Sequence, residues 1–309
     1  MLVLVTAAAA IRGAAWWRER DETVPASVRL VTTSRGRIAV DVRGQMQGVP
    51  VLIVPGTAGW SGFWREVSAH LARQGFRVIA VDLPPFGYSD RDPLGRYDRR
   101  RQAARLAAVL DRLAGRPAIV VAHSFGAGPA VELALNQPKR VARLVLVDAA
   151  IGQVDPPPQG GIPILEQPIV AQPLVAATLT NPHLIGLLSR SMLARKDAAA
   201  AWKETLRVPM RRPGTTTAYA AWLPSLFVAD DGAVSRRSAG LRTMRPPVRL
   251  IWGEDDTVTP IEQGERLSLL LRAPLRRLPG VGHVPHIEDR DGFLSALDEA
   301  VATDDHRNG

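Results

Sequence analysis

Residues 118–131, Ala-Ile-Val-Val-Ala-His-Ser-Phe-Gly-Ala-Gly-Pro-Ala-Val, decide the fold of this chain. The first four are apolar and largely β-branched, which predicts a buried strand. The turn that follows carries Ser124 at its apex, with the small residues Ala122 and Gly126 two positions away on either side. A helix of small residues is expected to follow. This pattern predicts a nucleophile elbow, a sharp turn that exposes a serine hydroxyl at the end of a strand.

A serine in such a turn is also compatible with an ordinary helix cap, so other residues must supply an acid and a base. Residues 247–252 predict a late strand, and the loop that leaves it carries Asp255 and Asp256. A Gly- and Pro-rich loop at 278–286 then carries His283. Serine, aspartate, histidine is one of the chain orders in which a nucleophilic serine occurs with its partners.

With these segments in place, the chain resembles the α/β-hydrolase superfamily over residues 28–302. Five segments carry the resemblance, in the expected order: 53–59, 80–90, 122–126, 252–256 and 282–286. It implies an α/β fold with a mostly parallel sheet flanked by helices and an inserted helical cap. Residues 28–150 and 241–309 are expected to form the α/β-hydrolase core. Residues 151–240 are expected to form the cap, which begins with a Pro- and Gly-rich linker at 155–161.

The resemblance also assigns roles. Ser124 is the expected nucleophile and His283 the base, because a serine hydroxyl attacks only if a neighbouring group takes its proton. Asp256 is the expected acid, which holds the imidazole in one tautomer. The backbone N–H groups of Thr57 and Phe125 are expected to form an oxyanion hole.

The sequence departs from the family pattern at three positions. Pro55 stands where histidine is usual, Ala122 where glycine is usual, and Pro85 where glycine is usual. Proline lacks an N–H, but the donors of the oxyanion hole come from other residues, so they are retained. Asp82 and Gly87, in the second of these loops, are interpreted as structural residues of a turn.

Each role has a rival in the sequence. Asp255 precedes Asp256, but the resemblance places the acid three residues after Gly253. Asp148 follows the apolar strand 144–147, where some relatives place the acid, and its alternative reading is a loop anchor or helix cap. A second candidate base, His286, is expected to line the pocket or to bond to backbone.

Two further polar residues are given supporting roles. His123 is expected to point away from the site and to serve packing. Glu288 is expected to support the histidine loop.

A serine at the elbow implies an acyl-enzyme and therefore esters, thioesters, amides, lactones or activated C–C bonds. The first reading is a serine hydrolase acting on a small to medium carboxylic ester. The alternatives are a C–C bond hydrolase of aromatic breakdown and a non-catalytic ligand-binding protein on the same fold. A cap arginine near the pocket, Arg190 or Arg195, would favour the C–C hydrolase, since it would receive a substrate carboxylate.

Apolar side chains of the cap are expected to line an acyl or aromatic pocket or to form the cap's own core. They are Ile162, Ile164, Leu165, Leu174, Leu179, Leu184, Leu187, Leu188, Met192, Trp202, Trp222, Leu226 and Phe227.

Composition limits the other function classes. The 309 residues suffice for one α/β domain with an insertion. The chain has no cysteine, which excludes disulfides and thiol catalysis, and its scattered histidines suggest no metal site. The net charge of +9 comes from arginines interleaved with acids, which favours a solvated surface over nucleic-acid binding. The expected partner is a small acyl substrate, with no cofactor.

Residues 1–27 are expected to be an apolar leader or a short membrane-associated segment. Residues 1–11 are apolar, and Trp16, Trp17 and Arg18 resemble a membrane-interface belt. The apolar run is shorter than the roughly 20 residues that a spanning helix needs, and no basic segment precedes it as in a secretory signal. A cytoplasmic or peripheral inner-membrane location is expected.

Overall fold

The computed structural model describes residues 2–21, 23–151, 162–226 and 232–302. At its centre is an eight-stranded sheet in the order β1-β2-β4-β3-β5-β6-β7-β8. The strands are β1 (Arg29–Thr33), β2 (Gly36–Arg43), β3 (Pro50–Val54), β4 (Arg77–Val81), β5 (Ala118–His123), β6 (Val141–Val147), β7 (Val248–Gly253) and β8 (Leu275–Leu278). Strands β1 and β2 form an antiparallel hairpin, β2 pairs antiparallel with β4, and the other pairs are parallel.

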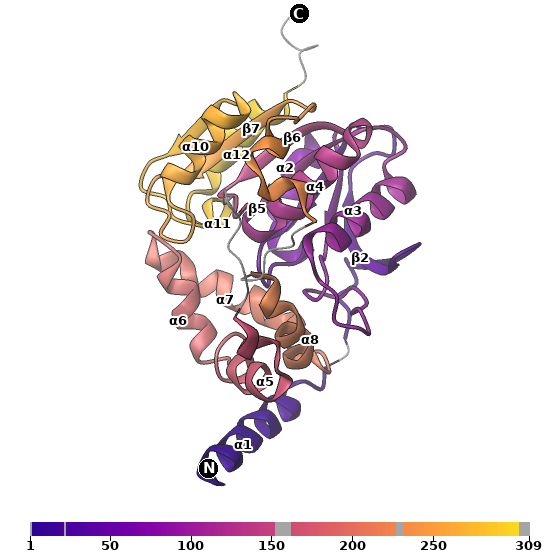
Figure 1. Cartoon of the computed structure of the whole chain (residues 1–309). Coiled ribbons are helices and arrows are strands. Elements are labelled where there is room, and N and C mark those ends of the chain that lie inside the picture. Colours follow the sequence, from indigo (N-terminus) through magenta and orange to yellow (C-terminus); the bar gives the residue numbers. More distant parts are fainter. Residues whose placement is uncertain (1, 22, 152–161, 227–231, 303–309) are drawn as a thin grey trace, which may run out of the picture.

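Helices cover both faces of the sheet (Figure 1). One face packs on α2 (Arg65–Arg73) and α12 (Arg290–Val301), and the opposite face packs on α3 (Arg99–Leu113), α4 (Ala127–Asn136) and α10 (Ile261–Leu271). The central strands β3 and β5 are buried at every position, as expected for parallel strands covered on both sides. The predicted α/β class, with a mostly parallel sheet flanked by helices, is confirmed.

Between β6 and β7 the chain forms a separate group of helices, which lies below the sheet in Figure 1. They are α5 (Pro168–Ala177), α6 (Leu184–Ser191), α7 (Ala199–Arg207) and α8 (Thr215–Trp222). The short α9 (Ser238–Leu241) also precedes β7, but it contacts α10, and its Leu241 is buried in the core. Helices α5–α8 fall within the segment that the sequence assigns to a cap. The expected linker at 155–161 and Phe227 lie outside the described residues.

Aromatic side chains join α7 and α8 to the core. Trp202 of α7 packs on Phe63 at 5.4 Å between ring centroids. Trp222 of α8 packs on Phe86 at 4.9 Å and on Phe125 at 5.3 Å. Trp222 is fully buried. These two cap residues therefore pack against the core, while several other apolar residues of the cap are exposed.

The N-terminal residues form a single helix, α1 (Leu2–Arg18), which projects from the cap end of the molecule (Figure 1). Its last turns contact α5, and Ala15 is buried there. In the described part of the chain, no helix has both the length and the apolar character needed to cross a membrane.

Candidate active site

The turn after β5 is as sharp as the sequence predicts. Ser124 has φ +49, in the left-handed region that an L-residue adopts only under constraint. A Cβ on Gly126 would lie 2.4 Å from the carbonyl oxygen of Pro55, so only glycine fits there. Ala122 is fully buried, and its methyl group is accommodated in the place of the usual glycine. Strand β5 and helix α4 thus hold the Ser124 hydroxyl at the carboxyl end of the sheet.

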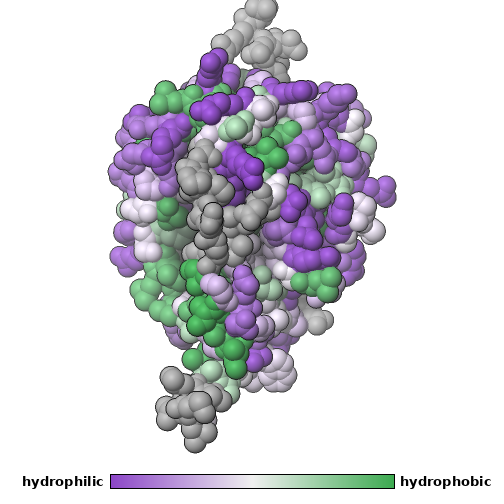
Figure 2. Space-filling model, in the orientation of Figure 1, coloured by the Kyte–Doolittle hydropathy of each residue, from purple (hydrophilic) through white to green (hydrophobic). Residues whose placement is uncertain are grey.

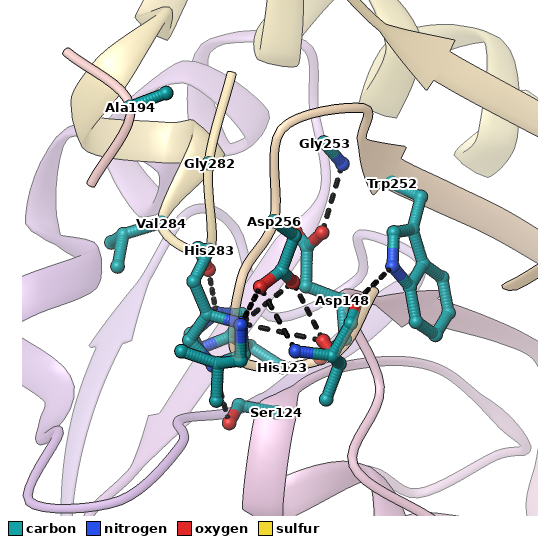
Figure 3. A network of polar contacts seen from close by, with 12 residues as sticks. His123, Ser124, Asp148, Ala194, Trp252, Gly253, Asp256, Gly282, His283 and Val284 are labelled. Atoms are coloured by element: carbon teal, nitrogen blue, oxygen red, sulfur yellow. Dashed lines mark hydrogen bonds and ion pairs between the residues drawn. The ribbon is translucent and has the colours of Figure 1, made fainter. Parts of the chain in front are cut away.

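Ser124, His283 and Asp256 form one hydrogen-bonded chain (Figure 3). Nε2 of His283 lies 2.8 Å from Oγ of Ser124, and its Nδ1 lies 2.8 Å from Oδ2 of Asp256. The three residues come from the loops after β5, β7 and β8, and none is more than 6 % exposed. The structure thus brings together the three residues singled out from the sequence, in a geometry that lets His283 take a proton from Ser124.

The carboxylate of Asp256 is fixed by its own loop. Oδ1 accepts the backbone N–H groups of Val258 at 2.7 Å and Thr259 at 2.9 Å, and Oδ2 accepts the Thr259 hydroxyl at 2.6 Å. Burial alone would raise the pKa of Asp256, but the hydrogen bonds from His283 and Thr259 outweigh it and lower the pKa below its usual range. Asp256 is therefore a carboxylate oriented toward His283.

Asp148, the rival acid, lies behind Asp256 at the end of β6 (Figure 3). Its Oδ1 accepts the N–H of Gly253 at 2.8 Å, and its backbone has φ +42. Burial, together with the negative charge of Asp256, raises the pKa of Asp148 well above its usual range. The raised pKa favours the protonated form of Asp148, and its hydrogen bond with Gly253 anchors the acid loop, which confirms the loop-anchor reading.

The two other histidines near the site are buried and neutral. His123 donates through Nε2 to the carbonyl oxygen of His283 at 2.7 Å, and burial lowers its pKa to about 3. It therefore also steadies the backbone of the base loop, beyond the packing role expected for it. His286 neither lines the cavity nor bonds to backbone, contrary to expectation. It stacks on Trp64 at 4.0 Å, and within the described part of the chain neither of its ring nitrogens has a hydrogen-bond partner.

Glu288 confirms the expectation that it supports the histidine loop. One oxygen accepts the N–H of Val284 at 3.0 Å, and the other accepts that of Gly282 at 3.1 Å. The second oxygen also accepts the N–H groups of Ala194 at 2.7 Å and Arg195 at 3.0 Å. Glu288 thus links the base loop to residues from the segment between β6 and β7. No pattern in the sequence signals that second contact.

The loop after β3 passes directly beside the elbow. A Cβ on Gly56 would lie 2.8 Å from the Cβ of Ser124, so the backbone that leads into Thr57 approaches the nucleophile closely. The N–H of Phe125 belongs to the residue after Ser124. Both expected donors therefore belong to backbone next to Ser124, and their role as an oxyanion hole stays a prediction. Asp82, in the next loop, accepts the N–H groups of Ser61 and Tyr88 at 2.7 and 2.8 Å, as expected of a structural residue.

A cavity of about 650 Å³ opens beside the site. Its lining includes Phe125, the residue after Ser124, and Thr259, which holds Asp256. Five arginines and two acidic residues line it as well: Arg96, Arg99, Arg100, Arg101, Arg236, Asp98 and Glu166. The three consecutive arginines at 99–101 belong to the positive charge that the sequence analysis assigns to a solvated surface, and they also border this cavity.

The cap arginines named from the sequence lie elsewhere. Arg195 donates to the carbonyl oxygens of Gly280 at 3.2 Å and Glu288 at 3.1 Å, so its guanidinium ties the cap segment to the base loop. Arg190 is exposed, and neither arginine lines the cavity. The expectation that one of them receives a substrate carboxylate stays a prediction, which their position outside this cavity does not favour.

Comparisons with known proteins agree with the fold. A family model described as the alpha/beta hydrolase fold matches residues 49–290. A 2-hydroxymuconate semialdehyde hydrolase of Pseudomonas sp. (strain CF600) is 28 % identical over 84 % of this chain and 88 % of its own length. A 2-hydroxy-6-oxononadienedioate/2-hydroxy-6-oxononatrienedioate hydrolase of Burkholderia vietnamiensis is 32 % identical over 69 % of this chain and 71 % of its own.

A solved structure, a thermophilic esterase from Thermogutta terrifontis, superposes with a TM-score of 0.70 at 21 % identity, covering 89 % of this chain and 97 % of the esterase. Because esterases and C–C hydrolases share this fold, the fold alone does not separate the two activities.

Proposed function

The chain belongs to the α/β-hydrolase family of enzymes, and on that premise we propose that it hydrolyses a C–C bond of a 2-hydroxy-6-oxo-dienoate. The observation that carries this proposal is the likeness to hydrolases named for such substrates, which extends over 84 % of the chain in one case. It favours the C–C hydrolase, the alternative in the sequence reading, over the ester hydrolase that the sequence reading put first.

In the proposed mechanism, Ser124 attacks the 6-oxo carbon while Nε2 of His283 takes the serine proton. The 2.8 Å separation of Oγ and Nε2 supports this transfer. Asp256 stabilises the imidazolium that forms. The N–H groups of Thr57 and Phe125 stabilise the charge that develops on the 6-oxo oxygen.

Cleavage of a C–C bond requires a stabilised carbanion as the leaving group. Conversion of the 2-hydroxyl to its keto tautomer lets the electron pair released at C5 delocalise onto the 2-oxo group. Collapse of the tetrahedral adduct then breaks the C5–C6 bond, leaves an acyl group on Ser124, and the carbanion takes up a proton. Water hydrolyses the acyl-enzyme with His283 as base. One water is consumed in total, and no oxidation or reduction occurs.

The charge of the cavity suits such a substrate. A dienoate carries a carboxylate, and arginines outnumber acidic residues five to two among the lining residues. Their combined field favours an anion in the cavity even where individual guanidinium groups also bond to protein. The aromatic ring of Phe125, beside Ser124, offers an apolar contact for the other end of the substrate.

The test compares two substrates on the purified full chain. A 2-hydroxy-6-oxo-dienoate and a p-nitrophenyl ester of similar size are assayed side by side, and mass spectrometry identifies both products of the former. We expect a kcat/KM at least 100-fold higher for the dienoate. We expect Ser124→Ala to lower its turnover by about 10³-fold or more. Ser68→Ala, a change at another buried serine on α2, serves as the matched control and should leave activity within about twofold.

Two results would overturn the proposal. Ester turnover that depends on Ser124 without C–C cleavage would restore the ester reading. Stoichiometric binding of the dienoate, with no turnover and no fluorophosphonate adduct on Ser124, would indicate the ligand-binding protein.

A further inference from the structure

We propose that α1 and an exposed apolar face of the cap insert into the surface of an anionic lipid bilayer. The proposal concerns a surface remote from the cavity at Ser124 and does not rest on the proposed reaction. The cap face is defined by five side chains of α5 and α6, which are called the cap patch below: Ile169, Leu174, Leu184, Leu187 and Leu188.

Helix α1 has the composition of a lipid-embedded helix but little protein around it. Its sequence, LVLVTAAAAIRGAAWWR, is mostly apolar, with Arg12 and Arg18 as its charged residues and no acidic residue. Residues 6–14 are exposed or half-buried, and Trp16 and Trp17 are each 68 % exposed. A mostly apolar helix is normally covered by protein or by lipid. Among the described residues, the rest of the protein packs only on the C-terminal end of α1. Lipid is therefore the environment that suits the remaining turns of this helix.

The C-terminal end of α1 is fixed to the cap. Ala15 is buried, and the guanidinium of Arg18 donates to the carbonyl oxygen of Ala176 on α5 at 3.4 Å. The buried carboxylate of Glu19 accepts the N–H of Thr216 at 2.9 Å and also the hydroxyl of that residue. A membrane that holds α1 would therefore also hold the cap in one orientation.

The cap patch continues this apolar surface. Ile169 is 77 % exposed and Leu187 is 65 % exposed, values unusual for large aliphatic side chains. Figure 2 shows the hydrophobic surface gathered over the cap end of the molecule, above the point where α1 projects. An apolar area of this kind on an otherwise charged surface is typical of a protein or membrane contact.

The positive charge near α1 favours an anionic lipid surface as the binding partner of α1 and the cap patch. Arg12, Arg18 and Arg20 lie in or next to α1, and the chain carries a net charge of +9. The guanidinium of Arg20 lies 4.2 Å from the centroid of the Trp16 ring, in cation–π geometry. Tryptophan and arginine together are the side chains that settle at the headgroup level of a bilayer. Anionic headgroups complement the arginines.

The position of the tryptophans sets the orientation of α1. Its 17 residues extend about 26 Å at the usual helical rise, and Trp16 and Trp17 lie at the end next to the cap. This arrangement places the two tryptophans at the interface, the cap patch against the headgroups and the remainder of the helix in the bilayer.

The experiment uses flotation of the full chain with vesicles of phosphatidylcholine alone and of phosphatidylcholine with 30 % phosphatidylglycerol, at low and high salt. We expect the partition coefficient to be at least tenfold higher on the anionic vesicles, and this preference to shrink at 500 mM NaCl. The double change Trp16→Ser and Trp17→Ser should lower binding at least tenfold. Leu269→Ser, at an 81 % exposed leucine on α10 far from α1 in sequence, is the control and should bind as the wild type does.

Three results would overturn the proposal. These are absence of binding to either vesicle, equal binding by the tryptophan double variant, and a concentration-dependent dimer that the double variant abolishes without any vesicle binding. The last would assign α1 to a second copy of this chain. An unchanged thermal midpoint shows that the double variant is folded. Flotation measures membrane binding and not turnover. A negative result for membrane binding can therefore be distinguished from a negative result for the proposed C–C hydrolysis.

Discussion

At the carboxyl end of the sheet, Ser124, Asp256 and His283 are buried and hydrogen-bonded, whereas on the cap Ile169 and Leu187 lie largely in the open. The first region is built on parallel strands whose backbone ladders fix every loop that leaves them. The second is a set of short helices joined to the core by aromatic contacts and by hydrogen bonds such as those of Glu288. The difference shows that the backbone of the sheet positions the three buried residues, while no such ladder holds the exposed side chains of α5 and α6.

The largest expected effect tests the two carboxyls within the buried region. Asp256→Asn should lower kcat by about 10⁴-fold, because an amide cannot stabilise the imidazolium of His283 and favours the wrong tautomer. Asp148→Asn should lower it by less than about tenfold. Asn resembles the protonated Asp148 in shape, can still accept from the N–H of Gly253, and tolerates the positive φ of 42. Steady-state kinetics of both variants on the same substrate make the comparison.

The Asp148→Asn variant should also differ from the wild type in how its free energy of unfolding depends on pH. Native Asp148 keeps a proton that the unfolded chain releases above about pH 4. The folded state therefore binds more protons, and stability falls as pH rises from there toward the raised pKa. Asp148→Asn removes this loss, so urea unfolding should find the variant at least as stable as the wild type at pH 7. In the kinetic comparison above, a loss of activity in Asp148→Asn as large as that in Asp256→Asn would show that Asp148 takes part in the reaction and is more than an anchor of the loop.

The sequence alone predicts those parts of the site whose geometry is set by residues close together in the chain. The elbow is predictable because only a small residue fits at Gly126, and the acid loop because Asp256 is held by N–H groups two and three residues on. Contacts between distant segments are not predictable in this way. His286 stacks on Trp64, more than 200 positions earlier in the chain, and Arg195 of the cap segment bonds to the base loop, and no local pattern encodes either contact.

A matched pair of leucines sharpens the contrast between sheet and cap. Leu52 in β3 is fully buried between two strands and the helices of one face, so Leu52→Ala should lower the free energy of unfolding by about 2–5 kcal/mol. Leu187→Ala on α6 removes a largely exposed side chain and should change it by less than about 0.5 kcal/mol. Urea denaturation of both variants provides the measurement. A loss above 2 kcal/mol at Leu187 would show that the cap patch is covered in solution.

The last comparison concerns the place where the two regions meet, at Glu288. Its carboxylate accepts N–H groups from Gly282 and Val284 on the base loop and from Ala194 and Arg195 on the cap side. Glu288→Gln turns one acceptor into a donor facing these N–H groups, which should cost about 1.5–3 kcal/mol of stability. Thermal unfolding should show it as a lower midpoint, by about 2–4 °C for each kcal/mol.

Glu299→Gln, at an exposed carboxylate on α12, is the matched control and should leave the midpoint unchanged. Since the loop that carries His283 is loosened in Glu288→Gln, kcat should fall together with the midpoint. A variant that loses stability but keeps full kcat would mean that His283 is held by its other contacts, with Asp256, with His123 and with the carbonyl oxygen of Met192, which accepts the N–H of His283 at 3.1 Å. The contacts of Glu288 would then contribute to the stability of the junction and not to the alignment of the base.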